Sequence, residues 1–195
     1  MQLGERAFGL LGLGRSREAL RKASASEARW ACLEEYVPAS TLQRSALASA
    51  WATHSEGDQR AMDQHLQQAV SLSPSLPQYA AEELPGEVQA AFVEAAEKLR
   101  GARRARLVVT VAGAPVEVYV DGELLSGNMG SGGVESAEVD LLPGRHLVQF
   151  AGSGPLAESI SFRVGSLGGE LGLDRVTPVK ANEVLQVFER SLARG

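Results

Sequence analysis

The sequence lacks most of the features that would point to chemistry. Its 195 residues include one cysteine and three histidines. A single cysteine excludes an internal disulfide, and Cys32 fits a small apolar interior residue better than a nucleophile. No G-x-S-x-G motif occurs, and no acid, base and nucleophile follow one another in a recognisable order. We therefore expect a non-catalytic protein that has no cofactor and no metal.

Long hydrophobic runs are also missing. No stretch of about 18 apolar residues exists, so no transmembrane helix is expected. The segment Phe8–Gly14 is too short for a secretory signal and is interrupted by glycine. We expect a periplasmic or cell-envelope location if a signal upstream of Met1 has been lost, and a cytoplasmic one if Met1 is the true start.

Aromatic residues make up only 5% of the chain, whereas hydrophobic residues make up 44%. Alanine, leucine and valine must then fill most of the core, which favours helices packed closely through small residues. The net charge of −5 is uneven, because residues 1–30 hold six basic and three acidic residues and residues 31–100 hold four basic and ten acidic ones. The basic residues Arg103, Arg104 and Arg106 fit a solvated linker. This balance disfavours nucleic acid as a partner.

Residues 3–100 follow the helical period. Met62, Leu66 and Ala69 share one face of a helix, and so do Ala28, Cys32 and Tyr36. The clearest stripe lies in residues 87–99 and consists of Val88, Phe92, Ala95 and Leu99.

Two segments of this half, residues 7–25 and 46–74, each pair two helices through a glycine-containing turn. The second segment has Ala46, Ala50, Ala69 and Pro74 at characteristic spacing. This arrangement resembles the tetratricopeptide repeat, in which small residues let paired helices approach closely. Two repeats are fewer than a solenoid usually needs, so the resemblance implies a small bundle of helical hairpins.

From residue 106 to residue 164 the period changes to two. Five alternating apolar segments predict five antiparallel strands, with turns at Asp121-Gly122 and Pro143-Gly144. In the segment 146–150, His146, Val148 and Phe150 are expected to face the core, with Leu147 and Gln149 on the other side. His146 is expected to be a packing residue.

Two motifs in this region resemble those of PEGA-type domains. They are Val118-Tyr119-Val120-Asp121-Gly122, and the segment 141–148, which reads L-L-P-G-R-H-L-V. The resemblance covers about 60 residues and implies a small β-sandwich with an extracytoplasmic, non-catalytic role. The chain departs from the family after Asp121-Gly122, because the glycine-rich stretch Gly127–Gly133 contains no proline.

Three domains follow from these patterns, with an α+β fold overall. They are a helical domain at 1–102 with tetratricopeptide-like hairpins, a PEGA-like β-sandwich at 105–165, and a glycine-rich segment with a C-terminal helix at 166–195. In that last helix Asn182 is the expected cap and Val184, Phe188 and Leu192 form the apolar stripe.

Two other groups of residues have some of the features of ligand sites. Gly127–Gly133 has the glycine content of a phosphate loop, but it leads into a strand and has no lysine, so a hairpin loop is favoured. His54, Asp58, Asp63 and His65 lie within twelve residues. Their spacing does not match that of a helical metal site, and exposed polar residues are favoured.

We therefore expect a protein-interaction or scaffold component of a bacterial cell-envelope assembly, whose partners are other proteins or, in a homo-oligomer, further copies of this chain. A carbohydrate- or peptidoglycan-binding module is the first alternative, and an enzyme of unknown type is the second. Aromatic side chains supply much of the energy of protein contacts. Tyr36, Trp51 and Tyr79 are the candidate anchors of a groove in the helical half, and Tyr119 is the candidate on the outer face of the strands.

Overall fold

The chain has a mixed α+β fold with small antiparallel sheets. The computed structural model describes the backbone of residues 2–30, 36–111, 115–131, 133–151, 156–164, 171–177 and 189–191. Side chains are described for residues 6–30, 36–111, 115–131 and 133–151. The chain divides into two compact units: a helical unit, Met1–Arg29 with Ala39–Gly101, and a β unit, Trp30–Pro38 with Ala102–Gly195.

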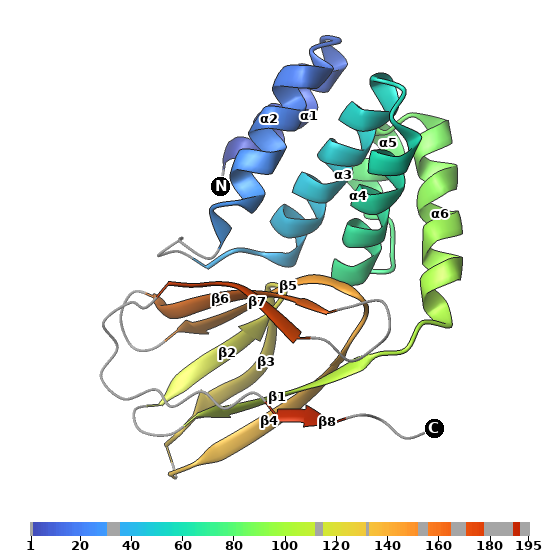
Figure 1. Ribbon diagram of the computed structural model, residues 1–195. Helices are drawn as coiled ribbons and strands as arrows, with labels where there is room; N and C mark the ends of the chain where they lie inside the picture. Colours follow the sequence, from blue (N-terminus) through green and yellow to red (C-terminus); the bar gives the residue numbers. More distant parts are fainter. Residues whose placement is uncertain are drawn as a thin grey trace. The chain divides into compact units, whose positions relative to one another are not determined.

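The helical unit is a row of antiparallel helices (Figure 1). They are α1 (Gln2–Gly12), α2 (Ser16–Glu27), α3 (Ala39–Ser55), α4 (Gln59–Leu72), α5 (Gln78–Glu83) and α6 (Gly86–Arg100). The α1–α2 hairpin packs against α3, α3 packs against α4, and α4 packs against α6. Consequently α2 and α6 lie on opposite sides of the α3–α4 pair (Figure 1).

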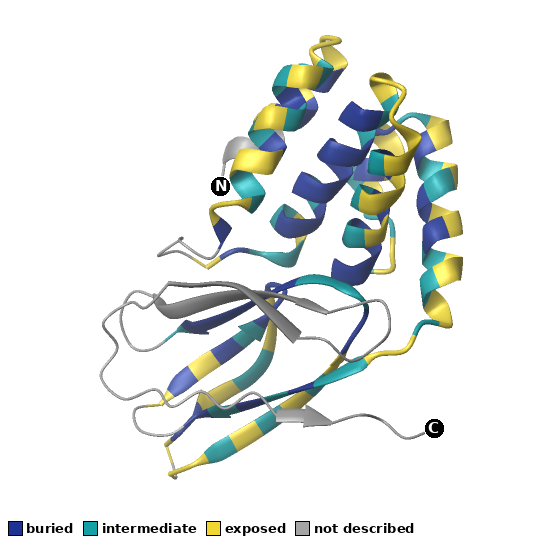
Figure 2. Cartoon of the chain, viewed as in Figure 1, coloured by how far each residue is buried: buried dark blue, intermediate teal, exposed yellow. Residues whose placement is uncertain are grey.

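Helix α3 forms the centre of the helical unit and is buried over most of its surface (Figure 2). It has this position because its side chains are small: Ala46, Ala48 and Ala50 are all fully buried. The predicted packing through small residues is therefore confirmed. The predicted stripes of α4 and α6 are confirmed as well, since Leu99 packs against the apolar core and the other members lie within it: Met62, Leu66, Ala69, Val88, Phe92 and Ala95.

The connection between α3 and α4 shows how the sequence ends one helix and starts the next. Gly57 has a φ of +77°, a conformation that a side chain would disfavour. The Asp58 carboxylate then accepts a hydrogen bond from the backbone N–H of Ala61 at 3.0 Å and caps α4. This short turn sets the two helices antiparallel.

The described strands of the β unit form two antiparallel sheets. One has the order β4-β1-β8 and the other has the order β3-β2-β5-β6-β7. Their bounds are β1 (Ala105–Val111), β2 (Val116–Val120), β3 (Glu123–Met129), β4 (Glu135–Leu141), β5 (Gly144–Ala151), β6 (Leu156–Val164), β7 (Leu171–Thr177) and β8 (Glu189–Ser191). A single apolar cluster takes side chains from both sheets, including Val109 of β1 and Val118 of β2.

The predicted turn at Asp121-Gly122 is confirmed. It joins β2 to β3, and its two residues have φ values of +51° and +75°. Two successive positive φ values characterise the tight hairpin turn that suits the twist of paired strands. Glycine adopts such a φ freely, and aspartate tolerates it better than most residues.

Several predictions for the strands were wrong. Residues 127–129 were expected to start a glycine-rich loop, but they complete β3, and a turn follows at Gly130. In β5, Leu147 and Gln149 were expected on an exposed side, yet both are fully buried. This strand lies between β2 and β6, and both its faces are covered.

The predicted C-terminal helix is also wrong at the residues that the structure describes there. Residues 189–191 form strand β8, in which Arg190 pairs with Leu107 of β1. Pairing with an existing strand satisfies backbone hydrogen bonds that β1 would otherwise leave open on that side, and this outweighs a local helical pattern. Residues 171–177 form β7 within the glycine-rich region. Asn182, Val184, Phe188 and Leu192 lie outside the described residues.

The expected helical stripe at Ala28, Cys32 and Tyr36 does not continue to Tyr36. Helix α2 ends at Glu27, and residues 36–38 are irregular and belong to the β unit. Cys32 lies outside the described residues. Across the described part of the chain, no helix is both long and apolar enough to cross a membrane.

Candidate interaction surfaces

An exposed apolar surface in the β unit combines residues from distant parts of the sequence. The rings of Tyr36 and Tyr119 pack together with their centroids 4.7 Å apart and their planes at 52°. Tyr119 of β2 lies opposite Leu124 of β3 in the strand register. Tyr36 is 42% exposed and Leu124 is 56% exposed. We call Tyr36, Tyr119 and Leu124 the tyrosine surface.

Hydrogen bonds hold both rings of the tyrosine surface in place. The Tyr36 hydroxyl donates to the carbonyl oxygen of Gly122, in the turn between β2 and β3. The Tyr119 hydroxyl donates to Oε2 of Glu117 at 2.7 Å, and this bond raises the pKa of Tyr119. Rings that are fixed before a partner arrives lose little conformational entropy on binding. The surface is thus organised for contact.

A buried ion pair supports the turn that carries Gly122. Nδ1 of His146 lies 2.6 Å from Oδ2 of Asp121, and Nε2 of His146 lies 2.7 Å from the carbonyl oxygen of Leu142. The other carboxylate oxygen of Asp121 accepts the backbone N–H of Leu147 at 2.9 Å. The β2–β3 turn is therefore fastened to the start of β5.

The charge of His146 follows from its partners, because both ring nitrogens face oxygen acceptors and each must donate a proton. Burial alone lowers the pKa of His146, but the negative charge of Asp121 and its hydrogen bond, together with that of Leu142, outweigh burial and raise it. His146 has no exposed surface. His146, which was expected to be a packing residue, is thus buried and charged, and it links two turns. We call the ion pair of His146 with Asp121 the clamp.

A second contact fixes the backbone beside Tyr36. The N–H of Val37 donates to Oε1 of Gln149 at 3.0 Å, and Gln149 is fully buried. Gln149 lies opposite Tyr119 in the pairing of β2 with β5. The segment 36–38 therefore contacts the side of β5 that was expected to be exposed.

The helical unit has an aromatic cluster of its own. Phe8 of α1 makes edge-on contacts with Trp51 of α3 and Tyr79 of α5, at centroid distances of 5.9 Å and 6.1 Å. The guanidinium of Arg44 lies 4.8 Å from the Phe8 ring centroid and 4.6 Å from that of Tyr79. These distances fall in the range of cation–π interactions. We call Phe8, Arg44, Trp51 and Tyr79 the arginine–aromatic cluster.

This cluster contains polar hydrogens that lack acceptors. Arg44 forms an ion pair with Glu83 at 3.2 Å through Nη2, whereas its buried Nε has no hydrogen-bond partner among the residues that the structure describes. Within the same residues the buried hydroxyl of Tyr79 has none either. Burial raises the pKa of Tyr79 to about 12, with smaller opposing effects of Arg44 and Glu83. The Tyr79 hydroxyl therefore stays protonated in neutral solution.

The four predicted anchor residues fall into two separate groups. Trp51 and Tyr79 both contact Phe8 in the helical unit, whereas Tyr36 packs against Tyr119 in the β unit. Tyr36 therefore does not join the expected groove of the helical half. Nothing in the sequence indicated that Tyr36 pairs with Tyr119, because 82 residues separate them and no motif contains both.

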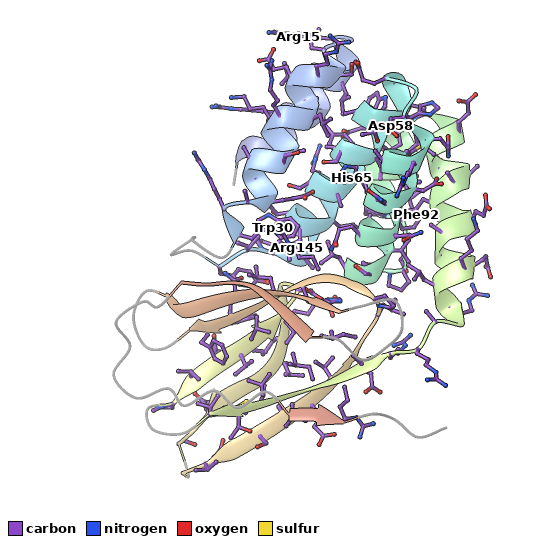
Figure 3. The ribbon with its side chains drawn as sticks, viewed as in Figure 1. Arg15, Trp30, Asp58, His65, Phe92 and Arg145 are labelled. Carbon is purple, nitrogen blue, oxygen red and sulfur yellow. The ribbon has the colours of Figure 1, made fainter. Side chains whose placement is uncertain are left out.

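The histidines and aspartates that lie within twelve residues of one another, His54, Asp58, Asp63 and His65, make contacts other than metal coordination. Asp58 and His65 both lie at α4 (Figure 3), where Asp58 caps the helix and burial lowers the pKa of His65. His54 lies 3.1 Å from Glu87, and Asp63 accepts a hydrogen bond from Gln59. Among the side chains that the structure describes, no group of three or more histidine, cysteine, aspartate or glutamate residues is placed to hold a metal.

Sequence reasoning missed several residues that shape these surfaces. Phe8, Arg44 and Glu83 were not predicted to meet, because a cation–π contact and an ion pair join three helices that are distant in sequence. Asp121 was identified only as a turn residue. Its link to His146 had one available signal, since both residues lie in the two motifs that resemble PEGA-type domains. Arg106, assigned to a linker, lies in β1 and pairs with Glu138 and Asp140.

Comparison with known proteins returned no match for this chain, whether with protein-family models, curated proteins or solved structures. The function must therefore be argued from the two clusters described above. The sequence resemblances to tetratricopeptide repeats and PEGA-type domains remain proposals.

Proposed function

We propose that this chain is a non-catalytic protein-interaction or scaffold component of a bacterial cell-envelope assembly. The observation that carries the proposal is the tyrosine surface, which is exposed, apolar and held by hydrogen bonds. Tyrosine is enriched at the centres of protein interfaces, because its ring buries much area while few torsions are frozen. Such a surface suits recognition by contact.

The proposal includes the two domain types that the sequence resembles. Support for tetratricopeptide-like hairpins comes from the order of packing, in which each helix of α1 to α4 lies beside its neighbour in sequence. Support for a PEGA-like sandwich comes from the clamp between Asp121 and His146, which joins the two motifs that suggested it. The envelope location and the bacterial source rest on that resemblance alone.

Affinity capture from the native host tests the protein-interaction proposal when it is combined with substitutions in the surface. Leu124→Asp introduces a charge beside Tyr119, and we expect it to remove the specific partner from the captured material. Val134→Asp is the matched control, because Val134 is 72% exposed in the same unit and lies outside the tyrosine surface. Equal capture by both variants would contradict the proposal.

One observation favours carbohydrate or peptidoglycan as a second candidate. Tyr36 supplies a second aromatic ring beside Tyr119, and the Glu117 carboxylate accepts a hydrogen bond from the Tyr119 hydroxyl at the edge of this pair. Aromatic rings with nearby hydrogen-bond acceptors suit the C–H faces and hydroxyls of sugars. Sedimentation with purified cell-wall sacculi separates the candidates. If the wild type stays bound to the sacculi after a high-salt wash and the Tyr36→Ala variant does not, the carbohydrate candidate is supported. The same result would count against the scaffold proposal.

A further inference from the structure

The two ends of the helical unit carry opposite charge. Residues 1–30, which include α1 and α2, hold six basic and three acidic residues. Residues 78–100, which include α5 and α6, hold five acidic and two basic residues. Because α2 and α6 lie on opposite sides of α3 and α4, the uneven charge of the sequence becomes a polarity along the row of helices (Figure 1).

The basic end presents its charges away from the core. In α2 the buried residues are Ala19 and Ala23, whereas Arg21 is exposed and Lys22 is partly exposed. Arg29, in the turn just after α2, is exposed as well. Within the described part of the chain, these three cations form no ion pair. We call Arg21, Lys22 and Arg29 the basic face. Arg15 lies at the tip of the same hairpin (Figure 3), beside Leu13, which is 74% exposed.

The acidic end has a similar arrangement of opposite sign. In α6 the core side consists of Val88, Phe92 and Ala95, and the other side is exposed (Figure 2). We call its carboxylates Glu87, Glu94 and Glu97 the acidic face. Val93, which lies between them in sequence, is 55% exposed.

Local ion pairs reduce the charge of the acidic face without cancelling it. Lys98 pairs with Glu94, Arg100 pairs with Glu97, and His54 pairs with Glu87. Most of these side chains are largely exposed, and exposed pairs of this kind contribute little and exchange readily. An incoming cation can therefore compete for the carboxylates.

We propose that the partner of these two faces is a second copy of this chain, with the basic face of one copy against the acidic face of the next. Helical hairpins that stack side by side have two ends, and among the helices that the structure describes no further one lies on the outer side of either end. The opposite signs favour attraction between unlike ends and repulsion between like ends. This inference deepens the proposed scaffold function, on which it rests, by naming one partner.

The geometry of the contact determines the kind of assembly. The two faces are different surfaces, so the contact is head-to-tail rather than two-fold symmetric. Such a contact leaves one free face at each end and adds copies until a ring closes or growth becomes limited by concentration. Exposed charges are screened over about 10 Å at 0.1 M salt, so assembly should weaken strongly as salt is raised.

Sedimentation velocity of the full chain at several concentrations and salt concentrations tests this proposal. At low salt the weight-average sedimentation coefficient of the wild type should rise with protein concentration, and it should return to the monomer value at high salt. Two variants reverse one face each, namely R21E/K22E and E94K/E97K. Either variant alone should lose at least about tenfold in association affinity, because one face now repels its counterpart.

An experiment that mixes the two variants tests head-to-tail contact most directly. In an equimolar mixture every acidic end of one variant meets a basic end of the other, so association should return. The single variant E94K is compared with E123K, which makes the same change at an exposed position of the β unit. E123K should associate as the wild type does. Circular dichroism confirms that all variants remain folded.

Each outcome has a definite meaning. Loss of association in both variants with recovery in the mixture supports head-to-tail stacking. A wild type that stays monomeric at low salt, association insensitive to salt, or a mixture that does not recover would overturn it. A failure here leaves capture through the tyrosine surface untouched, since that experiment uses a different unit and different substitutions. The two proposals can therefore fail separately.

Discussion

The helical unit and the β unit bury polar side chains in contrasting ways. The described interior of the helical unit contains neutral polar groups, such as Gln43, whose amide donates to the carbonyl oxygens of Ser73 and Ser75 at 3.0 Å. The β unit buries a charged pair, Asp121 with His146. A neutral amide depends only on local geometry, whereas a buried ion pair depends also on protonation. The stability of the two units should therefore respond to different changes.

The largest expected effect comes from removing one member of the buried pair. Asp121→Ala leaves the charged ring of His146 without its partner and should destabilise the β unit by about 3–5 kcal/mol. Urea unfolding followed by hydrogen exchange in β2 and β5 measures the loss. The helical unit should keep its exchange protection, and a loss below about 1 kcal/mol would show that the pair is not required.

The stability of the helical unit should instead be sensitive to the volume of its buried side chains. Ala46→Leu adds atoms to a fully buried position in α3 and should cost about 1–3 kcal/mol through overpacking. Ala90→Leu on the exposed side of α6 is the control and should change little. Chemical denaturation monitored by helical circular dichroism gives both values. Similar effects at the two positions would contradict the close packing around α3.

Replacing a tyrosine by phenylalanine should change the free energy of unfolding in opposite directions in the two units. Tyr36→Phe removes the hydrogen bond to the Gly122 carbonyl and should cost about 0.5–1.5 kcal/mol. Tyr79→Phe removes a buried hydroxyl that has no hydrogen-bond partner in the described part of the chain and should stabilise the protein by about 1 kcal/mol. Thermal unfolding of the two variants side by side measures the difference. If both substitutions destabilise equally, the Tyr79 hydroxyl has an acceptor in solution.

The stability of the β unit, unlike that of the helical unit, should decline gradually as the pH rises. The pKa of His146 is raised in the folded state, so the native protein binds more protons than the unfolded chain above about pH 6.5. The contribution of the clamp is complete below that pH and is lost as the pH rises through the folded-state pKa. Denaturation of the β unit between pH 6 and 9 should show this decline, and His146→Gln should remove it.

The sequence carried the local pattern of most elements but not their partners. The alternation in 107–111 and 137–141 predicted β1 and β4, and the helical period predicted α4 and α6. Strand β3 was missed because its sequence, ELLSGNM, does not alternate. Its register with β2 is irregular in two places, and such bulges blur the period of two.

The candidate surfaces were harder to predict than the elements. Tyr36 has a helical spacing with Ala28, but it lies in a segment that packs on strands more than 80 residues away. Gln149 also contacts the same segment, because its side-chain oxygen accepts a hydrogen bond from the backbone N–H of Val37. Contacts of this kind depend on tertiary packing and leave no periodic signal along the chain. The charge difference between residues 1–30 and 31–100, in contrast, was plain in the sequence.

Photocrosslinking in the native host tests the central claim, that the tyrosine surface binds another protein, most directly. A photoreactive residue replaces Leu124 in one variant and Val134 in the other, both exposed and both in the β unit. The account predicts a discrete crosslinked species containing a second protein from position 124 and none from position 134. Equal crosslinking from both positions, or none from position 124, would contradict it.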